Sequence, residues 1–121
     1  MESSKSETNL AVIAAPNGVM ASSLRTFLQT IPGDWVVASV NTLADACLEV
    51  DRGRPKFLLL DAELAKAALV DWIEQLLASA PGLRLIVLVN SEEQQAAAQV
   101  GGAAFTLLKG FLENDLRQLV E

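Results

Sequence analysis

The chain has 121 residues, enough for one domain with a buried core, and its 51% hydrophobic residues exclude a disordered polypeptide. Nine basic and fifteen acidic residues give a net charge of −6 without a basic cluster, so this chain is not expected to bind nucleic acid directly. The sequence has no histidine, which argues against a zinc site or a histidine-dependent catalytic triad.

The first residues predict a leader. Residues 1–9 are polar and rich in serine, and we expect them to form a flexible leader ahead of a single domain over residues 10–121. They contain no apolar segment of the kind that a signal peptide needs, and no apolar run approaches the roughly 20 residues that span a bilayer. A cytoplasmic location without a membrane partner is therefore expected. The single cysteine, Cys47, cannot form an internal disulfide, which agrees with that location.

Short apolar runs along the chain predict five strands. Their near-continuous apolarity is typical of strands that are covered on both faces, as in a parallel sheet. The predicted strands are residues 10–15, 35–40, 57–60, 83–89 and 104–108.

Amphipathic stretches between and after these runs predict five helices. Each carries one apolar stripe at helical spacing. They lie around residues 20–31, 43–50, 69–77, 93–100 and 112–120. Thr42 and Ser91 precede two of these stretches and are predicted N-terminal caps. Strands alternating with helices predict an α/β fold with an open, doubly wound parallel sheet.

Two charged residues mark the expected site. In open α/β sheets, ligands and reactive groups lie beyond the carboxyl ends of the strands. The third predicted strand ends at Asp61 and the fifth ends at Lys109, and we expect an ion pair between them. Because exposed ion pairs contribute only about 0–1 kcal/mol, the substitution Asp61→Asn is expected to change stability little.

The surroundings of these two residues resemble a known family. Residues 57–61, Phe-Leu-Leu-Leu-Asp, look like the strand of response-regulator receiver domains that ends in the phosphoacceptor aspartate. Residues 102–109, Gly-Ala-Ala-Phe-Thr-Leu-Leu-Lys, look like the receiver segment that ends in the invariant lysine. The resemblance covers residues 9–121 and implies a flavodoxin-like, three-layer α/β/α fold with a five-stranded parallel sheet in the order 2-1-3-4-5. It makes Asp61 the candidate phosphoacceptor and Lys109 the equivalent of the conserved lysine.

The sequence also departs from the receiver pattern. Receivers carry an acidic pair after the first strand that holds Mg²⁺, and those positions here are Ala15 and Pro16. The switch hydroxyl at the end of the fourth strand is replaced by Val89, and the switch aromatic of the fifth strand by Thr106. Mg²⁺ sites use one or two carboxylates, so we expect no resident cofactor, weak Mg²⁺ affinity and impaired phosphorylation switching.

The resemblance therefore implies a regulatory domain of two-component signal transduction, a pseudo-receiver rather than an enzyme. Its expected partner is a protein: a histidine kinase, its own output domain or a second copy in a homodimer. In this family the contact is made by the fourth helix, the fifth strand and the fifth helix. A helix-turn-helix output domain, and with it transcription regulation, is implied if the natural protein continues past Glu121.

Two alternatives remain at this point. The first is a conventional receiver that a histidine kinase phosphorylates on Asp61. The second, ranked lower, is a small-molecule binder of the flavodoxin type. It would need a hydroxyl-rich and glycine-rich phosphate loop after the first strand, which residues 16–23 match poorly.

Overall fold

The computed structural model describes residues 9–110 and 113–120, which form a five-stranded parallel sheet. The sheet has the order β2-β1-β3-β4-β5, as predicted. Every predicted strand is present, with ends shifted by at most one residue. The strands are β1 (Asn9–Ala14), β2 (Trp35–Val40), β3 (Phe57–Asp61), β4 (Arg84–Val89) and β5 (Phe105–Leu108).

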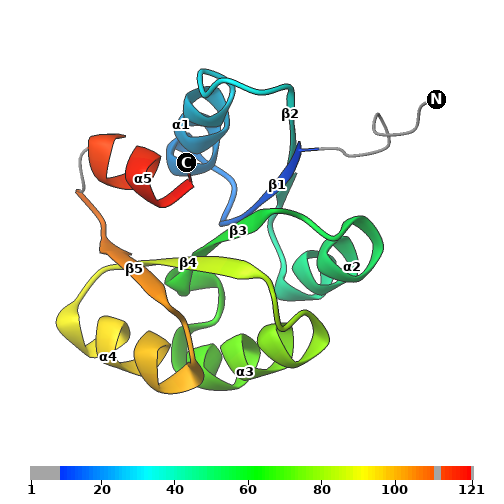
Figure 1. Ribbon diagram of the computed structural model, residues 1–121. Coiled ribbons are helices and arrows are strands. Elements are labelled where there is room, and N and C mark those ends of the chain that lie inside the picture. Colours follow the sequence, from blue (N-terminus) through cyan, green and yellow to red (C-terminus); the bar gives the residue numbers. More distant parts are fainter. Residues whose placement is uncertain (1–8, 111–112, 121) are drawn as a thin grey trace.

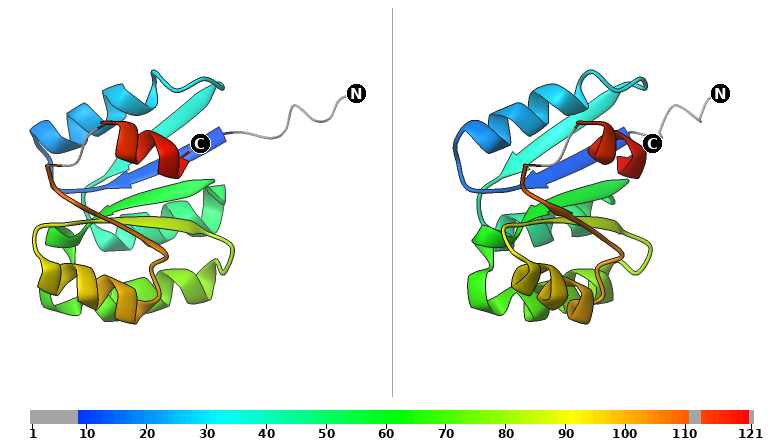
Figure 2. Two further views of the ribbon diagram at one scale, coloured as in Figure 1. Left: turned by 60° about the vertical axis from the view of Figure 1, so that its left-hand side comes forward. Right: turned by 90° about the vertical axis from the view of Figure 1, so that its left-hand side faces the viewer.

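Helices cover both faces of this sheet, which gives the predicted three layers (Figures 1 and 2). On one face lie α1 (Val19–Leu28) and α5 (Glu113–Val120). On the other face lie α2 (Leu43–Gly53), α3 (Leu69–Ser79) and α4 (Glu92–Gly101). None of the helices in the described residues has the length and hydropathy to span a bilayer.

Some predicted boundaries need correction. Asn9, which was predicted to belong to the leader, is part of β1 and pairs with Trp35 of β2. Residues 1–8 of the predicted leader and Leu112 of the predicted fifth helix lie outside the described residues. Two short 3₁₀ helices, η2 (Ala62–Leu64) and η3 (Lys66–Ala68), connect β3 to α3 and were not predicted.

The core consists of two apolar layers separated by the sheet. Because successive side chains of a strand point to opposite faces, β1 and β3 each supply both layers. Val12, Ala14, Leu58 and Leu60 pack under α2, α3 and α4, whereas Ala11, Ile13, Phe57 and Leu59 pack under α1 and α5. All five residues of β3 are buried, which makes β3 the centre of the domain.

Local interactions fix the helices that flank the site. The hydroxyl of Thr42 accepts a hydrogen bond from the N–H of Asp45 at 3.1 Å, and the hydroxyl of Ser91 accepts one from the N–H of Gln94 at 3.2 Å. Both predicted caps are thus confirmed. At the other end of α4, Gly101 is buried against α3, where an added Cβ would lie only 3.0 Å from the Cβ of Ile73. The absence of a side chain at Gly101 permits this close approach of the two helices.

Cys47 lies half-buried against the layer under α2. Burial and, to a smaller extent, the negative charge of Asp51 raise the pKa of its thiol above the usual value of 9.0. The thiol is therefore protonated at neutral pH and acts as a small apolar group of the core.

The substitution Ile73→Ala should lower the free energy of unfolding by about 2–5 kcal/mol, because Ile73 is fully buried and its loss leaves a cavity. Urea denaturation followed by far-UV circular dichroism measures the change. The matched control is Glu74→Ala on the exposed side of the same helix, which should change stability by less than about 0.5 kcal/mol. Equal effects of the two substitutions would contradict the described packing of α3.

Candidate functional site

Asp61 and Lys109 meet at the carboxyl edge of the sheet. Asp61 is the last residue of β3, and Lys109 follows the last residue of β5, with β4 between the two strands. The Nζ atom of Lys109 lies 2.8 Å from Oδ1 of Asp61, which confirms the predicted ion pair. The backbone N–H of Lys109 also donates to the carbonyl of Val89 at 2.8 Å, and this bond holds the lysine beside β4.

The environment of Asp61 differs from the sequence-based expectation. The strand end was predicted to be partly solvated, but only 3% of the Asp61 surface is exposed, against 22% of the Lys109 side chain. The carboxylate is buried because the apolar strands and η2 surround it. A buried carboxylate needs compensation, which comes from Lys109 and from the N–H of Glu63, a donor to Oδ1 at 2.9 Å. The small effect of Asp61→Asn on stability was predicted for an exposed ion pair, and the burial of Asp61 shows that this assumption was wrong.

A second set of polar contacts joins the segment after β3 to the start of α4. The Glu63 carboxylate accepts hydrogen bonds from Nδ2 of Asn90 and, at 3.4 Å, from Nε2 of Gln94. The Oε1 atom of Gln94 in turn accepts from the backbone N–H of Asn90 at 2.7 Å. We call Glu63, Asn90 and Gln94 the loop bridge, because they connect the segment after β3 to the segment after β4 at the carboxyl edge.

Ala15 and Pro16, which occupy the positions of the acidic pair of receivers, follow β1 and supply no side-chain ligand for a metal ion. Ala15 is buried and its N–H donates to the carbonyl of Val40 at 3.1 Å, while Pro16 is exposed. Neither side chain carries an oxygen. No group of three or more acidic or cysteine residues in residues 9–110 and 113–120 could hold a metal ion.

The charges at this edge also disfavour a cation. The single negative charge of Asp61 is already balanced by the positive charge of Lys109, and the Glu63 carboxylate is engaged in the loop bridge. A divalent ion prefers several oxygen ligands, of which one or two are usually carboxylates. The residues present therefore do not fit the Mg²⁺ site that the fold family implies.

The two predicted switch positions are also fixed in place. Val89 is fully buried at the end of β4 and has no hydroxyl group to donate to a phosphoryl oxygen. Thr106 of β5 accepts a hydrogen bond from Nε2 of Gln95 at 3.0 Å, so this side chain connects β5 to α4. The sequence reasoning missed Gln94 and Gln95 as parts of the site. The position of Gln94 three residues after the Ser91 cap was the available signal for the first of them.

The order and direction of the strands and the helices on both faces give the fold of response-regulator receiver domains. No protein-family model matches the chain, and the curated proteins include no match. The comparison with solved structures instead finds response regulators and their receiver domains. At sequence identities below 20%, this likeness shows the shared fold.

Three of these structures illustrate the range. The receiver domain of a sensor histidine kinase from Pseudomonas aeruginosa is 18% identical, with a TM-score of 0.80 over 94% of this chain and 95% of that one. A LuxR-family DNA-binding response regulator from Staphylococcus aureus is 15% identical, with a TM-score of 0.78 over 93% and 95%. A CheY-like receiver domain protein from Methanospirillum hungatei is 17% identical, with a TM-score of 0.77 over 93% and 90%. The Pseudomonas domain holds a magnesium ion in its active-site cleft.

A double-mutant cycle with Asp61→Asn and Lys109→Met measures the strength of the buried pair. We expect a coupling energy of about 1–2 kcal/mol, because a hydrogen bond to a charged group contributes roughly 1.5–3 kcal/mol and the exposed part of Lys109 weakens it. Urea denaturation of the wild type, both single variants and the double variant supplies the four free energies.

The control cycle replaces Asp61→Asn by Asp71→Asn, an exposed change on α3, and should give a coupling below about 0.5 kcal/mol. A coupling near zero for Asp61 and Lys109 would contradict the buried pair and support the solvated pair that the sequence predicted.

Proposed function

We propose that this chain is a receiver-like regulatory domain that signals through contact with a protein partner and does not depend on phosphorylation of Asp61. The observation that carries the proposal is the closed environment of Asp61. Its carboxylate is buried, paired with Lys109 and bonded to the N–H of Glu63, and neither Ala15 nor Pro16 adds a second carboxylate. Phosphorylation of an aspartate in a receiver domain requires a bound metal ion beside it. Here the charge beside Asp61 is that of Lys109.

Energetics support the same proposal. Moving a two-state element from 1:99 to 99:1 takes about 5.5 kcal/mol of differential binding. One hydrogen bond to a charged group supplies roughly 1.5–3 kcal/mol. Val89 cannot donate such a bond, and Thr106 is already bonded to Gln95. A modification that makes the same contacts in two conformations cannot shift the equilibrium between them. The surface formed by α4, β5 and α5 is therefore expected to stay in one conformation.

The surface proposed for the partner is formed by α4, β5 and α5. Two of its apolar residues are solvent-exposed, Val100 of α4 at 72% and Leu108 of β5 at 43%. Exposed apolar side chains favour a protein partner over a nucleic acid, which would need a basic surface. The partner class is a histidine kinase, an output domain or a second copy of this chain. The role is regulatory rather than catalytic, in the cytoplasm and without a membrane partner.

One observation favours a second candidate, a conventional receiver that is phosphorylated on Asp61. The aspartate and the lysine that this chemistry uses are both present, with 2.8 Å between their charged atoms. In that case the ion pair would be a resting state, and Lys109 would contact the phosphoryl group. The two candidates differ in whether treatment with a phosphodonor changes the domain.

Incubation of the domain with Mg²⁺ and a small phosphodonor such as acetyl phosphate should leave it unchanged. We expect no Asp61-dependent gain of mass, no change of oligomeric mass and no shift of the amide resonances of α4 and β5. Intact-mass spectrometry, light scattering and two-dimensional NMR measure these three properties. Mg²⁺ alone should shift the amides around Asp61 only at concentrations above about 10 mM, because too few carboxylates are present.

The variant Asp61→Asn is the negative control for modification elsewhere on the chain. The variant Pro16→Asp adds a carboxylate at an exposed position of the same edge and should lower the Mg²⁺ concentration at which the shifts appear. A phosphodonor effect that is present in the wild type and absent in Asp61→Asn would overturn the proposal and establish the conventional receiver.

A further inference from the structure

Three cationic residues gather at the amino edge of the sheet, the edge opposite to Asp61. Arg54 follows α2, Lys56 precedes β3, and Arg84 is the first residue of β4. Parallel pairing of β3 with β4 places Phe57 opposite Arg84, and so brings Arg84 beside Lys56. The expectation that the chain has no basic cluster, which came from reading the residues in order, is therefore wrong at this edge.

These residues line a cavity of about 490 Å³. Its wall also includes Asn9, Trp35 and Gly82. No acidic residue of the described chain lines this cavity. The volume lies within the range of roughly 300–1,000 Å³ that is usual for small-molecule sites.

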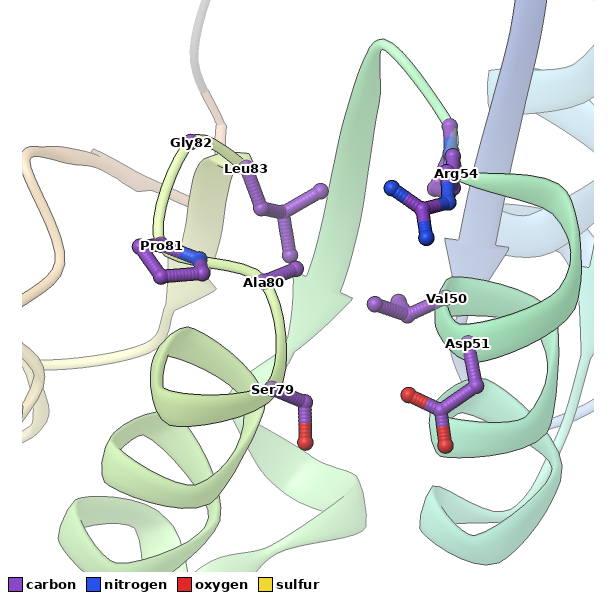
Figure 3. A pocket seen from close by; sticks show the side chains of 9 residues that line it. Val50, Asp51, Arg54, Ser79, Ala80, Pro81, Gly82 and Leu83 are labelled. Atoms are coloured by element: carbon purple, nitrogen blue, oxygen red, sulfur yellow. The ribbon is translucent and has the colours of Figure 1, made fainter.

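Arg54 has an unusual backbone and an unpaired side chain. It ends α2 in the left-handed conformation with φ of 49°, which is uncommon for a residue other than glycine. Figure 3 shows its guanidinium extending over an adjoining cavity of about 430 Å³, which Val50, Leu83 and the acidic residue Asp51 also line. The guanidinium has no hydrogen bond or ion pair with any residue of the described chain. Arg54 thus stands between two cavities with its donors unused.

Arg84 is held in place from the other side. Its Nη1 atom donates to the carbonyl of Leu119 in α5 at 3.0 Å. A guanidinium has five N–H donors, so most of the donors of Arg84 are still available at the rim of the cavity. The contact with α5 orients the group before any ligand arrives.

We propose that this cavity binds a small ligand that carries two or more oxyanion groups, phosphate or carboxylate, through Arg54, Lys56 and Arg84. Three cationic residues that line one cavity repel each other, and a bound oxyanion would offset this repulsion. Guanidinium groups match the two oxygens of a phosphate or a carboxylate with paired hydrogen bonds. The site is independent of the proposed function, because it lies at the opposite edge of the sheet from Asp61.

Titration of the full chain with pyrophosphate and, separately, with citrate tests the proposal. We expect saturable binding of one ligand per chain to at least one of the two, with amide shifts at residues 54–56 and 82–84. The variants Arg54→Gln and Lys56→Gln should each weaken binding about tenfold or more. Raising the ionic strength from about 0.02 M to 0.3 M should also weaken binding, because these cations are exposed.

Arg52→Gln is the matched control. Arg52 is an exposed residue in the last turn of α2, two positions before Arg54, and it lines neither cavity. Arg52→Gln and Arg54→Gln change the net charge by the same amount. It should change the affinity less than about twofold. Melting curves of all variants verify folding, and Lys56→Gln serves as the second test if Arg54→Gln is unstable.

The result separates the two sources of the anion. Binding of pyrophosphate alone identifies a phosphate-bearing ligand, and binding of citrate alone identifies a carboxylate-bearing one. Failure of both to bind saturably would overturn the proposal. An equal loss of affinity in Arg52→Gln and Arg54→Gln would also overturn it, since only diffuse charge attraction would then be present.

Discussion

The burial of a carboxylate at the end of the central strand is the constraint on which this domain depends. β3 is buried at all five positions, and the fifth of them is Asp61. An ionised group in such a place has to be compensated by an opposite charge and by hydrogen bonds. The lysine after β5 and the N–H of Glu63 meet this demand, and both come from segments that the parallel sheet brings to one edge. The site is thus also a structural requirement of the fold.

The same constraint links the site to α4. η2 begins directly after Asp61 and contains Glu63, whose carboxylate accepts hydrogen bonds from Asn90, just before α4, and from Gln94 in its first turn. Thr106 and Gln95 add a contact from the neighbouring strand. These contacts connect the segments after β3 and β4, and the strand β5, to the first turns of α4. Under the proposed function, Asp61 and Lys109 stabilise the fold through their ion pair and do not serve a metal ion.

Most of the fold could be predicted from the sequence, because the period of apolar residues changes clearly between strands and helices. The 3₁₀ segment after β3 could not, since the alanine-rich residues 62–68 have no such period. The pair of Asp61 and Lys109 was predictable from strand ends, but the burial of Asp61 depends on the packing of neighbouring elements. The cluster of Arg54, Lys56 and Arg84 was hidden because it depends on the register between β3 and β4.

The close contact of Gly101 with α3 has a consequence for how this domain could be controlled. Together with the contacts of Gln94 and Gln95, it fastens α4 at both of its ends. Under the proposed function, a helix that is held in this way would offer a partner a single conformation of its surface. The fraction of the domain that is bound to its partner would then depend only on the concentrations of the two proteins and on their affinity. Gene expression and protein turnover, rather than a chemical mark, would then control the signal.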